Sequence, residues 1–187
     1  NYFERQLGRW TKQYRAAETE RFEAVENLIS WLTDNMPADD GQVSLIHGDY
    51  RLDNIIFDPD KPEALAVLDW ELSTLGHPMA DLAYFCMCLR LPPVGHIKGL
   101  AGLDCEALGV PTEAQIIARY CELRGIECIE HWMFYLAFSF FRLAAIAQGV
   151  LKRALDGNAS SEKAQQVGSM TPVLAQLAMT MITEEQQ

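Results

Sequence analysis

The feature that most constrains the fold is a change of pattern between residues 43 and 68. Three short apolar runs lie there, at Val43–Ile46, Ile55–Phe57 and Leu65–Leu68. Residues 58–63, which include two prolines and two aspartates, separate the second run from the third and predict a β-hairpin. The polar residues between the first two runs are therefore expected on a loop framed by small strands, where a rigid scaffold presents functional groups.

The segments on either side of this region have helical patterns. Apolar residues recur at helical spacing from Phe3 to Tyr14 and from Phe22 to Leu32, which predicts two helices that end before Pro37. Four later helices are predicted: residues 80–91, Thr112–Gly125 with a Thr112/Gln115 capping box, Ile129–Leu155, and a last one that begins after Ser160 or Ser161. Pro172 is expected to kink or split that last helix, and residues 94–110 are expected to form a loop. The sequence thus predicts a single α+β domain over residues 1–187 that is predominantly helical.

Composition excludes some classes of function. The 187 residues are 49% hydrophobic and 22% charged, which is typical of a soluble globular domain. A formal charge of −11 argues against a nucleic-acid partner, because phosphate backbones require clustered Lys and Arg. An acidic surface favours cationic substrates, although solubility is the commoner reason for such a charge. The five cysteines show no paired or zinc-ligand spacing, so reduced thiols and a cytoplasmic location are expected.

The most apolar stretch, Trp132 to Val150, is about long enough to span a bilayer. Arg142 lies in its middle, and Gln148 and Gly149 interrupt its end, so a buried core helix and no membrane partner are predicted. The N-terminus has no apolar region of the signal-peptide kind, and it lacks an initiator Met. The chain is therefore expected to begin inside a longer protein.

The loop after the first apolar run has the residues that phosphoryl transfer requires. A carboxylate must accept the proton of the attacking hydroxyl, and oxygen ligands from Asp and Asn must hold Mg²⁺ against the nucleotide phosphates. In kinases the proton-accepting Asp and a metal-binding Asn share one loop with the spacing H-x-D-x-x-x-x-N. His47, Asp49 and Asn54 reproduce that spacing, and Asp69 follows the third apolar run, where a second metal ligand is expected.

These motifs resemble the aminoglycoside phosphotransferase/choline kinase-like family. The resemblance covers His47-Gly48-Asp49 through Asn54, Leu68-Asp69-Trp70-Glu71, and Gly76-His77-Pro78 with Asp81-Leu82-Ala83. Trp70-Glu71 follows the second Asp, where ordinary protein kinases have Phe-Gly. The form of the motifs is especially similar to the branch fused to acyl-CoA dehydrogenases and to its bacterial relatives. The resemblance implies a protein-kinase-like C-terminal lobe whose small β-hairpin insert carries the catalytic loop.

The resemblance also implies a role for each site residue. Asp49 would be the catalytic base, and Asn54 and Asp69 would bind Mg²⁺. Arg51 could neutralise charge on the transferring phosphoryl group. Two further residues would support the site: His47 by hydrogen bonds near Asp69, and Asp81 by attaching the following helix to the loop.

The implied function is ATP-dependent transfer of the γ-phosphoryl group to a hydroxyl of a small molecule. Residues 1–42 contain no Gly-rich loop and no nucleotide-binding Lys strand, so the N-terminal nucleotide-binding lobe is expected outside this chain. The chain alone is then expected to be inactive. A non-catalytic kinase-like binding or regulatory module remains the alternative. Aminoglycoside, choline-like and hydroxyacyl-CoA acceptors all stay open, with the branch resemblance favouring the last.

Overall fold

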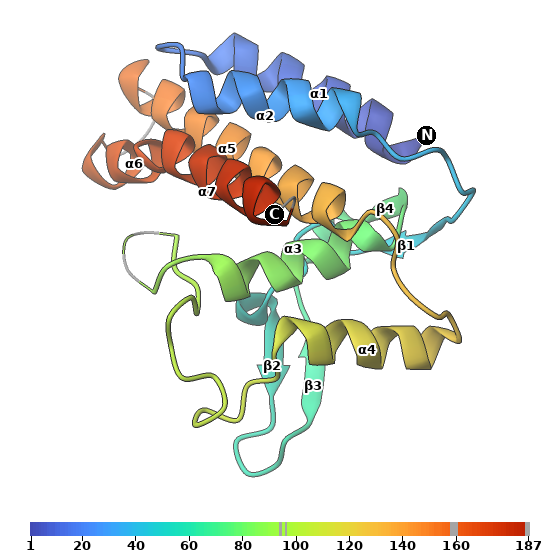
Figure 1. Ribbon diagram of the computed structural model, residues 1–187. Coiled ribbons are helices and arrows are strands. Elements are labelled where there is room, and N and C mark those ends of the chain that lie inside the picture. Colours follow the sequence, from blue (N-terminus) through green and yellow to red (C-terminus); the bar gives the residue numbers. More distant parts are fainter. Residues whose placement is uncertain (94, 96, 158–160, 186–187) are drawn as a thin grey trace.

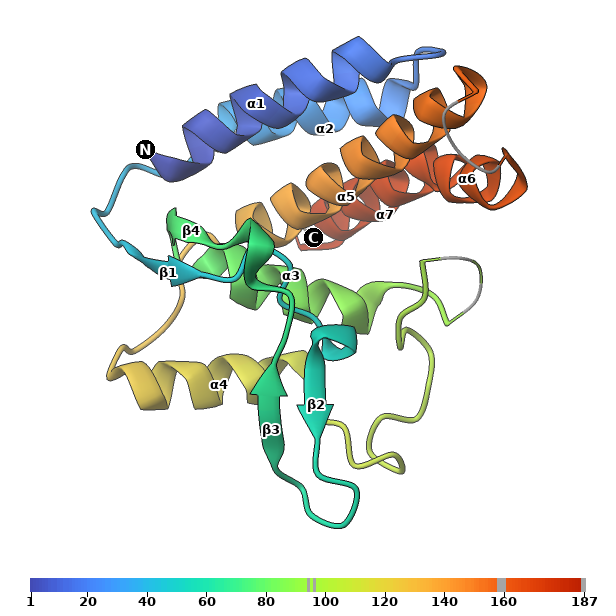
Figure 2. The same cartoon turned by 180° about the vertical axis from the view of Figure 1, so that it is seen from behind.

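The computed structural model describes residues 1–187 except 94, 96, 158–160 and 186–187. Its described part contains seven α-helices and four short β-strands (Figures 1 and 2). The helices are α1 (Tyr2–Ala17), α2 (Glu23–Asp34), α3 (Met79–Arg90), α4 (Glu113–Arg124), α5 (Trp132–Leu155), α6 (Ser161–Gly168) and α7 (Met170–Glu185). The strands are β1 (Ser44–Ile46), β2 (Ile55–Phe57), β3 (Ala64–Val67) and β4 (Thr74–Gly76). The fold is mostly helical with a small β region, as the sequence predicts.

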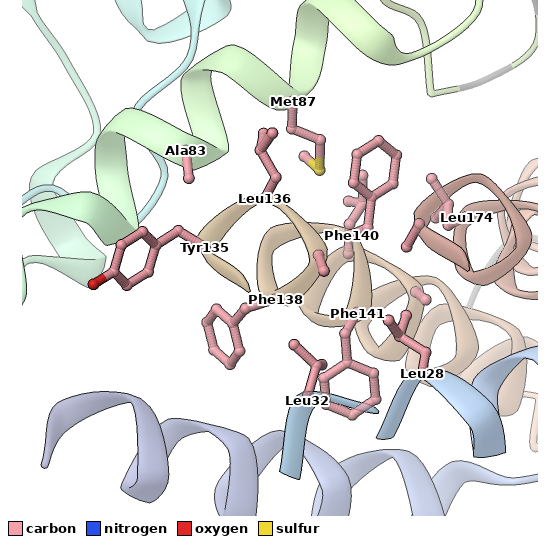
Figure 3. Packing of buried hydrophobic residues seen from close by; sticks show 14 of the residues in the cluster. Leu28, Leu32, Ala83, Met87, Tyr135, Leu136, Phe138, Phe140, Phe141 and Leu174 are labelled. Atoms are coloured by element: carbon pink, nitrogen blue, oxygen red, sulfur yellow. The ribbon is translucent and has the colours of Figure 1, made fainter. Parts of the chain in front are cut away.

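Helix α5 forms the centre of the core. It packs against α1, α2, α3, α6 and α7, and it is apolar on almost every face because helices surround it. Figure 3 shows Leu136 pointing toward α3, Phe140 pointing between Met87 of α3 and Leu174 of α7, and Phe141 pointing toward α2. By length and composition α5 could also cross a membrane, but 72% of its most apolar window is buried inside the protein. This burial is what a core helix requires.

Helices α1 and α2 lie side by side over one face of α5 (Figures 1 and 2). Their buried residues recur three, four or seven positions apart, which places them on one face of each helix: Phe3, Leu7, Tyr14 and Ala17 in α1, and Val25, Leu28 and Leu32 in α2. The exposed faces are joined by Arg15, whose Nη2 donates to Glu26 Oε2 at 2.8 Å. Both predicted helices are therefore confirmed, and both end before Pro37.

The first residue of helix α4, Glu113, ties that helix to α3 and α5. Glu113 accepts hydrogen bonds from Arg90 Nε at 2.6 Å, Arg90 Nη2 at 2.7 Å and Trp132 Nε1 at 3.0 Å. The predicted capping box is present, because the Thr112 hydroxyl accepts from the Gln115 N–H and the Gln115 side chain accepts from the Thr112 N–H. These contacts fix the first turn of α4, and Ile116 and Tyr120 farther along the helix pack against the core.

The predicted break in the last helix is confirmed, with a small difference in its place. Helix α6 ends at Gly168 and α7 begins at Met170, so the break lies at Ser169. Pro172 lies in the first turn of α7, where its missing N–H costs no helical hydrogen bond. The proline therefore starts the second helix and does not bend it.

The four strands form two separate antiparallel pairs. Strand β1 pairs with β4, with Ser44 opposite Gly76, and β2 pairs with β3, with Ile55 opposite Val67. The three apolar runs that predict strands coincide with β1, β2 and β3 to within a residue. The sequence did not predict β4, because its residues Thr74-Leu75-Gly76 contain only one large apolar side chain and therefore form no apolar run. The β1–β4 pair brings residues 47–54 beside residues 68–73.

Candidate active site

The loop of residues 47–54 is fixed at its start by Asp81, in the first turn of α3. The two oxygens of this carboxylate accept hydrogen bonds from the backbone N–H of His47 at 2.6 Å and of Gly48 at 2.9 Å. Gly48 has φ +83°, and a Cβ there would lie 2.6 Å from the carbonyl oxygen of Leu72. Only glycine fits this turn without strain, so the loop leaves β1 with one defined shape.

His47 connects this loop to the turn after β3. Its ring is buried, with 2% exposure, and packs 4.8 Å from the Trp70 ring. Its Nδ1 accepts from the Asp49 N–H at 3.2 Å, so the ring proton is assigned to Nε2, which donates to the carbonyl oxygen of Leu68 at 2.7 Å. One imidazole therefore contacts both the backbone of Asp49 and the residue before Asp69.

Asp49 and Asn54 are in direct contact. The Asn54 amide nitrogen donates to the Asp49 backbone oxygen at 2.8 Å and to Asp49 Oδ2 at 3.0 Å. Both side chains are half-buried. The segment from Asp49 to Asn54 thus forms a closed turn in which the predicted base and one predicted metal ligand face each other.

Two further charged or polar groups surround the Asp49 carboxylate. Arg51 pairs with Asp53; burial opposes the charge of Arg51, but the Asp53 carboxylate outweighs that effect and raises the pKa of Arg51. Burial raises the pKa of Tyr84 to about 12, and the negative charge of nearby Asp49 adds to the rise. Tyr84 is therefore a protonated hydroxyl beside the carboxylate. The structure places Arg51 against Asp53, and its catalytic role stays a prediction.

Asp69 follows β3 and has a left-handed backbone, with φ +67° and ψ +48°. Non-glycine residues rarely adopt this conformation, which is concentrated at functional sites. The N–H of Leu68 donates to the carbonyl oxygen of Asn54 at 2.8 Å, so Asp69 directly follows a residue that is paired with Asn54. The carboxylate of Asp69 is exposed. The backbone segments that carry the two predicted metal ligands, Asn54 and Asp69, therefore lie side by side.

The chemistry of Asn54 and Asp69 fits a magnesium ion. Because the Asn54 amide nitrogen is used by Asp49, its oxygen remains available, and the Asp69 carboxylate is open to solvent. Mg²⁺ prefers oxygen ligands and usually takes one or two carboxylates from the protein, with phosphates and water completing its shell. In the part of the chain that the structure describes, no group of three His, Cys, Asp or Glu side chains could hold a metal ion alone. A metal here would need oxygen atoms from a nucleotide or water.

A comparison with protein-family models decides the family. The model described as "Phosphotransferase enzyme family" matches residues 1–103, which include the loop, both strand pairs and α3. This match covers more than half of the 187 residues. The chain belongs to the phosphotransferase enzyme family.

Relatives of this phosphotransferase-family chain include much longer proteins. Acyl-CoA dehydrogenase family member 10 of Mus musculus is 52% identical over 99% of this chain. Acyl-CoA dehydrogenase family member 11 of Homo sapiens is 43% identical over 96% of it. The chain spans only 17% and 23% of the length of those two relatives. The resemblance to the branch fused to acyl-CoA dehydrogenases is thereby confirmed.

A solved structure is also similar to this phosphotransferase-family chain. It is the crystal structure of a Ralstonia eutropha protein that is provisionally named an aminoglycoside phosphotransferase. The two share 48% sequence identity with a TM-score of 0.91, over 98% of this chain and 56% of the other. The kinase-like fold that the motifs imply is therefore present, and the chain corresponds to about half of that neighbour.

Sequence reasoning missed three contributions to the site. Tyr84 lies one helical turn after Asp81, and this spacing of three residues was a signal that both could face the loop. Arg142 reaches the loop from α5, where its Nη2 donates to the carbonyl oxygen of Gly48. Helix α4 closes one side of a cleft of about 470 Å³ beside the loop, lined by His47, Tyr50 and Trp70 opposite Ile116, Arg119 and Tyr120. No local pattern marks the last two contributions, since both depend on packing between distant segments.

The strand region of this family member exposes large apolar side chains. Val43, Leu45 and Leu75 are 68%, 63% and 68% exposed. The set between residues 43 and 75, called the strand surface below, is Val43, Leu45, Leu52, Ile56, Phe57, Leu65, Leu68, Trp70, Leu72 and Leu75. In other proteins, contiguous exposed apolar patches are typical of surfaces that bind another molecule or domain.

Proposed function

We propose that this chain is the catalytic lobe of a small-molecule kinase that transfers the γ-phosphoryl group of ATP to a hydroxyl group. The observation that supports this function best is the contact between Asp49 and Asn54. It joins a base candidate to a metal-ligand candidate on a loop that Asp81 and His47 fix from two sides. Pre-organised groups of this kind are what phosphoryl transfer needs, since its catalysis is mostly positioning and charge stabilisation.

In the proposed reaction the acceptor hydroxyl lies against Asp49, which takes its proton as the bond from oxygen to the γ-phosphorus forms. The bond between the γ-phosphorus and the bridging oxygen of ATP breaks, and ADP leaves. Tyr84 keeps its own proton because its pKa is raised to about 12, so it can donate a hydrogen bond near Asp49 without competing for the proton. Asn54 and Asp69 would hold Mg²⁺, which when bound neutralises phosphate charge. Arg51 would release Asp53 and bind the phosphoryl group, and its positive charge would then stabilise the negative charge on the transferring group.

We also propose that a nucleotide-binding lobe of the same protein, outside residues 1–187, covers the strand surface. Two findings support this partner. The strand surface is apolar and borders the loop that carries Asp49, and a similar solved protein contains nearly as much chain again beyond the part that this sequence matches. Without that lobe the chain lacks the phosphate-covering loop, so we expect no turnover from residues 1–187 alone.

The candidate acceptors fall into two classes. Aminoglycosides suit the formal charge of −11, whereas hydroxylated acyl-CoA compounds suit the similarity to proteins named acyl-CoA dehydrogenase family members. We propose a cytoplasmic protein without a nucleic-acid or membrane partner. All five cysteines are free, and α5, the one helix among the described residues that is apolar enough to span a bilayer, lies in the core.

The function can be tested with the full-length protein that contains this chain. Consumption of ATP with Mg²⁺ would be measured in the presence of aminoglycosides, choline and hydroxyacyl-CoA compounds, and the phosphorylated product would be identified by mass spectrometry. We expect one class to give turnover, and the Asp49→Ala variant to lose at least about a hundredfold in kcat. Asp60→Ala, which removes an exposed carboxylate at the tip of the hairpin, is the matched control and should retain full activity.

Two outcomes would count against the proposal. Full activity of Asp49→Ala would remove the assigned base. Binding of a small molecule without any ATP consumption, under conditions in which the full-length protein is folded, would instead favour the non-catalytic binding or regulatory module.

A further inference from the structure

Arg142 is a charged residue in the middle of a core helix. It is half-buried in α5, whose neighbouring residues Phe141 and Leu143 are buried and apolar. Within the described residues, no carboxylate lies within 4.0 Å of its guanidinium to form an ion pair. Withdrawing an arginine from water without an acid partner costs free energy, so its other contacts must explain its position.

The guanidinium of Arg142 contacts three different segments. It lies 5.5 Å from the centre of the Trp10 ring on α1 and 4.9 Å from the centre of the Tyr84 ring on α3. Cations over aromatic faces are attracted by the charge distribution of the ring. Its Nη2 donates to the carbonyl oxygen of Gly48, and its buried Nε has no partner among the described residues. The one strong hydrogen bond that this cation makes to the described residues is therefore directed at the loop.

Gly48 is consequently bound from both sides by charged groups. Asp81 on α3 accepts from its N–H, and Arg142 on α5 donates to its carbonyl oxygen. Gly48 also has a left-handed backbone conformation, through which the chain turns toward Asp49. Because hydrogen bonds to charged groups are stronger than neutral ones, this pair can fix a turn that would otherwise have several conformations.

We infer that Arg142 is a positioning residue, which holds the Gly48 carbonyl so that Asp49 points at the acceptor hydroxyl. This inference rests on the proposed function, in which Asp49 is the base. Arg142 acts through Gly48 and through the ring of Tyr84, which borders Asp49, and it does not contact the reacting atoms. Its place in α5 ties the geometry of the loop to the helix at the centre of the core.

The test compares Arg142→Met, Arg142→Lys and wild type in the full-length protein. Methionine keeps much of the length and removes the charge and the hydrogen bond, whereas lysine keeps the charge and loses the planar fork. The matched control is Arg153→Met, an exposed arginine farther along the same helix. Hydrogen exchange would be followed in peptides that cover residues 47–54, together with kcat and KM for ATP.

We expect Arg142→Met to exchange about 10- to 100-fold faster at residues 47–54, the factor that one hydrogen bond from a charged donor contributes. Exchange in α5 should stay unchanged. In the turnover assay kcat should fall by about 10- to 100-fold with an unchanged KM for ATP, because a displaced base slows chemistry without removing nucleotide contacts. Arg142→Lys should lie between Arg142→Met and wild type, and Arg153→Met should match wild type.

The inference would be overturned if the Arg142→Met protein folds and its residues 47–54 exchange hydrogen at the wild-type rate. If Arg142→Met does not fold, wild-type exchange and wild-type kcat in Arg142→Lys would overturn it equally. Failure of the proposed function is separate, because it would show as full activity of Asp49→Ala while the exchange of Arg142→Met is still accelerated.

Discussion

The helical core and the strand region use the same apolar residue types in opposite ways. In the core, Leu28, Leu136, Phe140 and Phe141 are buried among α2, α3, α5 and α7 (Figure 3). In the strand region, Leu45 and Leu75 are mostly exposed. The strand region is held by the backbone hydrogen bonds of its two strand pairs and by a few directed hydrogen bonds that Asp81 and His47 make to the loop.

This difference suggests that the helical core determines stability, whereas the loop in the strand region determines function. Burial of apolar area is non-directional and tolerates many side chains, so the core sets the free energy of unfolding. The loop of residues 47–54 depends on Asp81, His47 and Arg142, each of which makes contacts of defined direction. Changes in the core should therefore act mainly on stability, and changes in the side chains that contact the loop mainly on activity.

The largest expected effect on stability is that of Phe140→Ala. This fully buried side chain in α5 should cost about 3–5 kcal/mol in the free energy of unfolding, because its removal leaves a cavity. Leu75→Ala, at a position that is 68% exposed, should cost less than about 0.5 kcal/mol in residues 1–187. Urea unfolding of the two variants measures both values. Equal costs would show that the two regions do not differ as described.

Gly48→Ala tests the shape of the loop inside the strand region. The added Cβ would meet the carbonyl oxygen of Leu72 at 2.6 Å and also adopt a positive φ, so a loss of about 1–3 kcal/mol is expected. Gly41→Ala is the matched control, because Gly41 has φ +73° but an added Cβ there would meet no described atom within 4 Å. Thermal unfolding gives the loss of stability in both variants, and the difference between them is the cost of the steric clash with Leu72 apart from the cost of the positive φ. A larger loss at Gly41 would contradict the close approach of Leu72.

The smallest expected effect concerns the attachment of α4. Burial opposes the charge of Glu113, but Arg90 and Trp132 outweigh it and hold the pKa of Glu113 below its ordinary value of 4.5. A lowered pKa in the folded state adds stability above pH 4.5, and this stability is lost as the pH falls through the folded value. Glu113→Gln should therefore cost about 1 kcal/mol at neutral pH and progressively less below pH 4.5.

The control for α4 is Glu122→Gln, which breaks a pair with Arg119 on the exposed face of the same helix. Its stability should match wild type between about pH 7 and pH 4, because exposed pairs contribute little. Unfolding by urea at several pH values gives both curves. A cost for Glu113→Gln that grows toward acid pH would have the wrong sign for a depressed pKa.

Most of the fold could be predicted because its elements have local sequence signals. Helices α1 and α2 show helical spacing of apolar residues, and α4 shows both its capping box and its terminal glycine. Strand β4 contains only one large apolar residue, Leu75, and it exists because β1 pairs with it, a contact across about thirty residues that no local pattern records. The predicted start of α5 at Ile129 differs from the observed Trp132 by three residues, since no capping side chain marks that end.

The candidate residues of the site could be proposed from the sequence, but the contacts between them could not. The spacing of His47, Asp49 and Asn54 is visible in the chain, and the structure adds that Asn54 contacts Asp49 directly. The left-handed backbone of Asp69 depends on the turn between β3 and β4. Arg142 reaches Gly48 across 94 residues, so only the packing of α5 against the loop reveals it.

The most direct test of the account is the Asp49→Asn variant of the full-length protein. Asparagine can still accept the hydrogen bond of Asn54 but cannot take a proton. The substitution therefore removes the proposed base and keeps a contact that stabilises the loop. Turnover with ATP and the identified acceptor should fall by about 10²- to 10⁴-fold, with an unchanged midpoint of thermal unfolding. Turnover within about threefold of wild type, at equal stability, would contradict the assignment of Asp49 as the base.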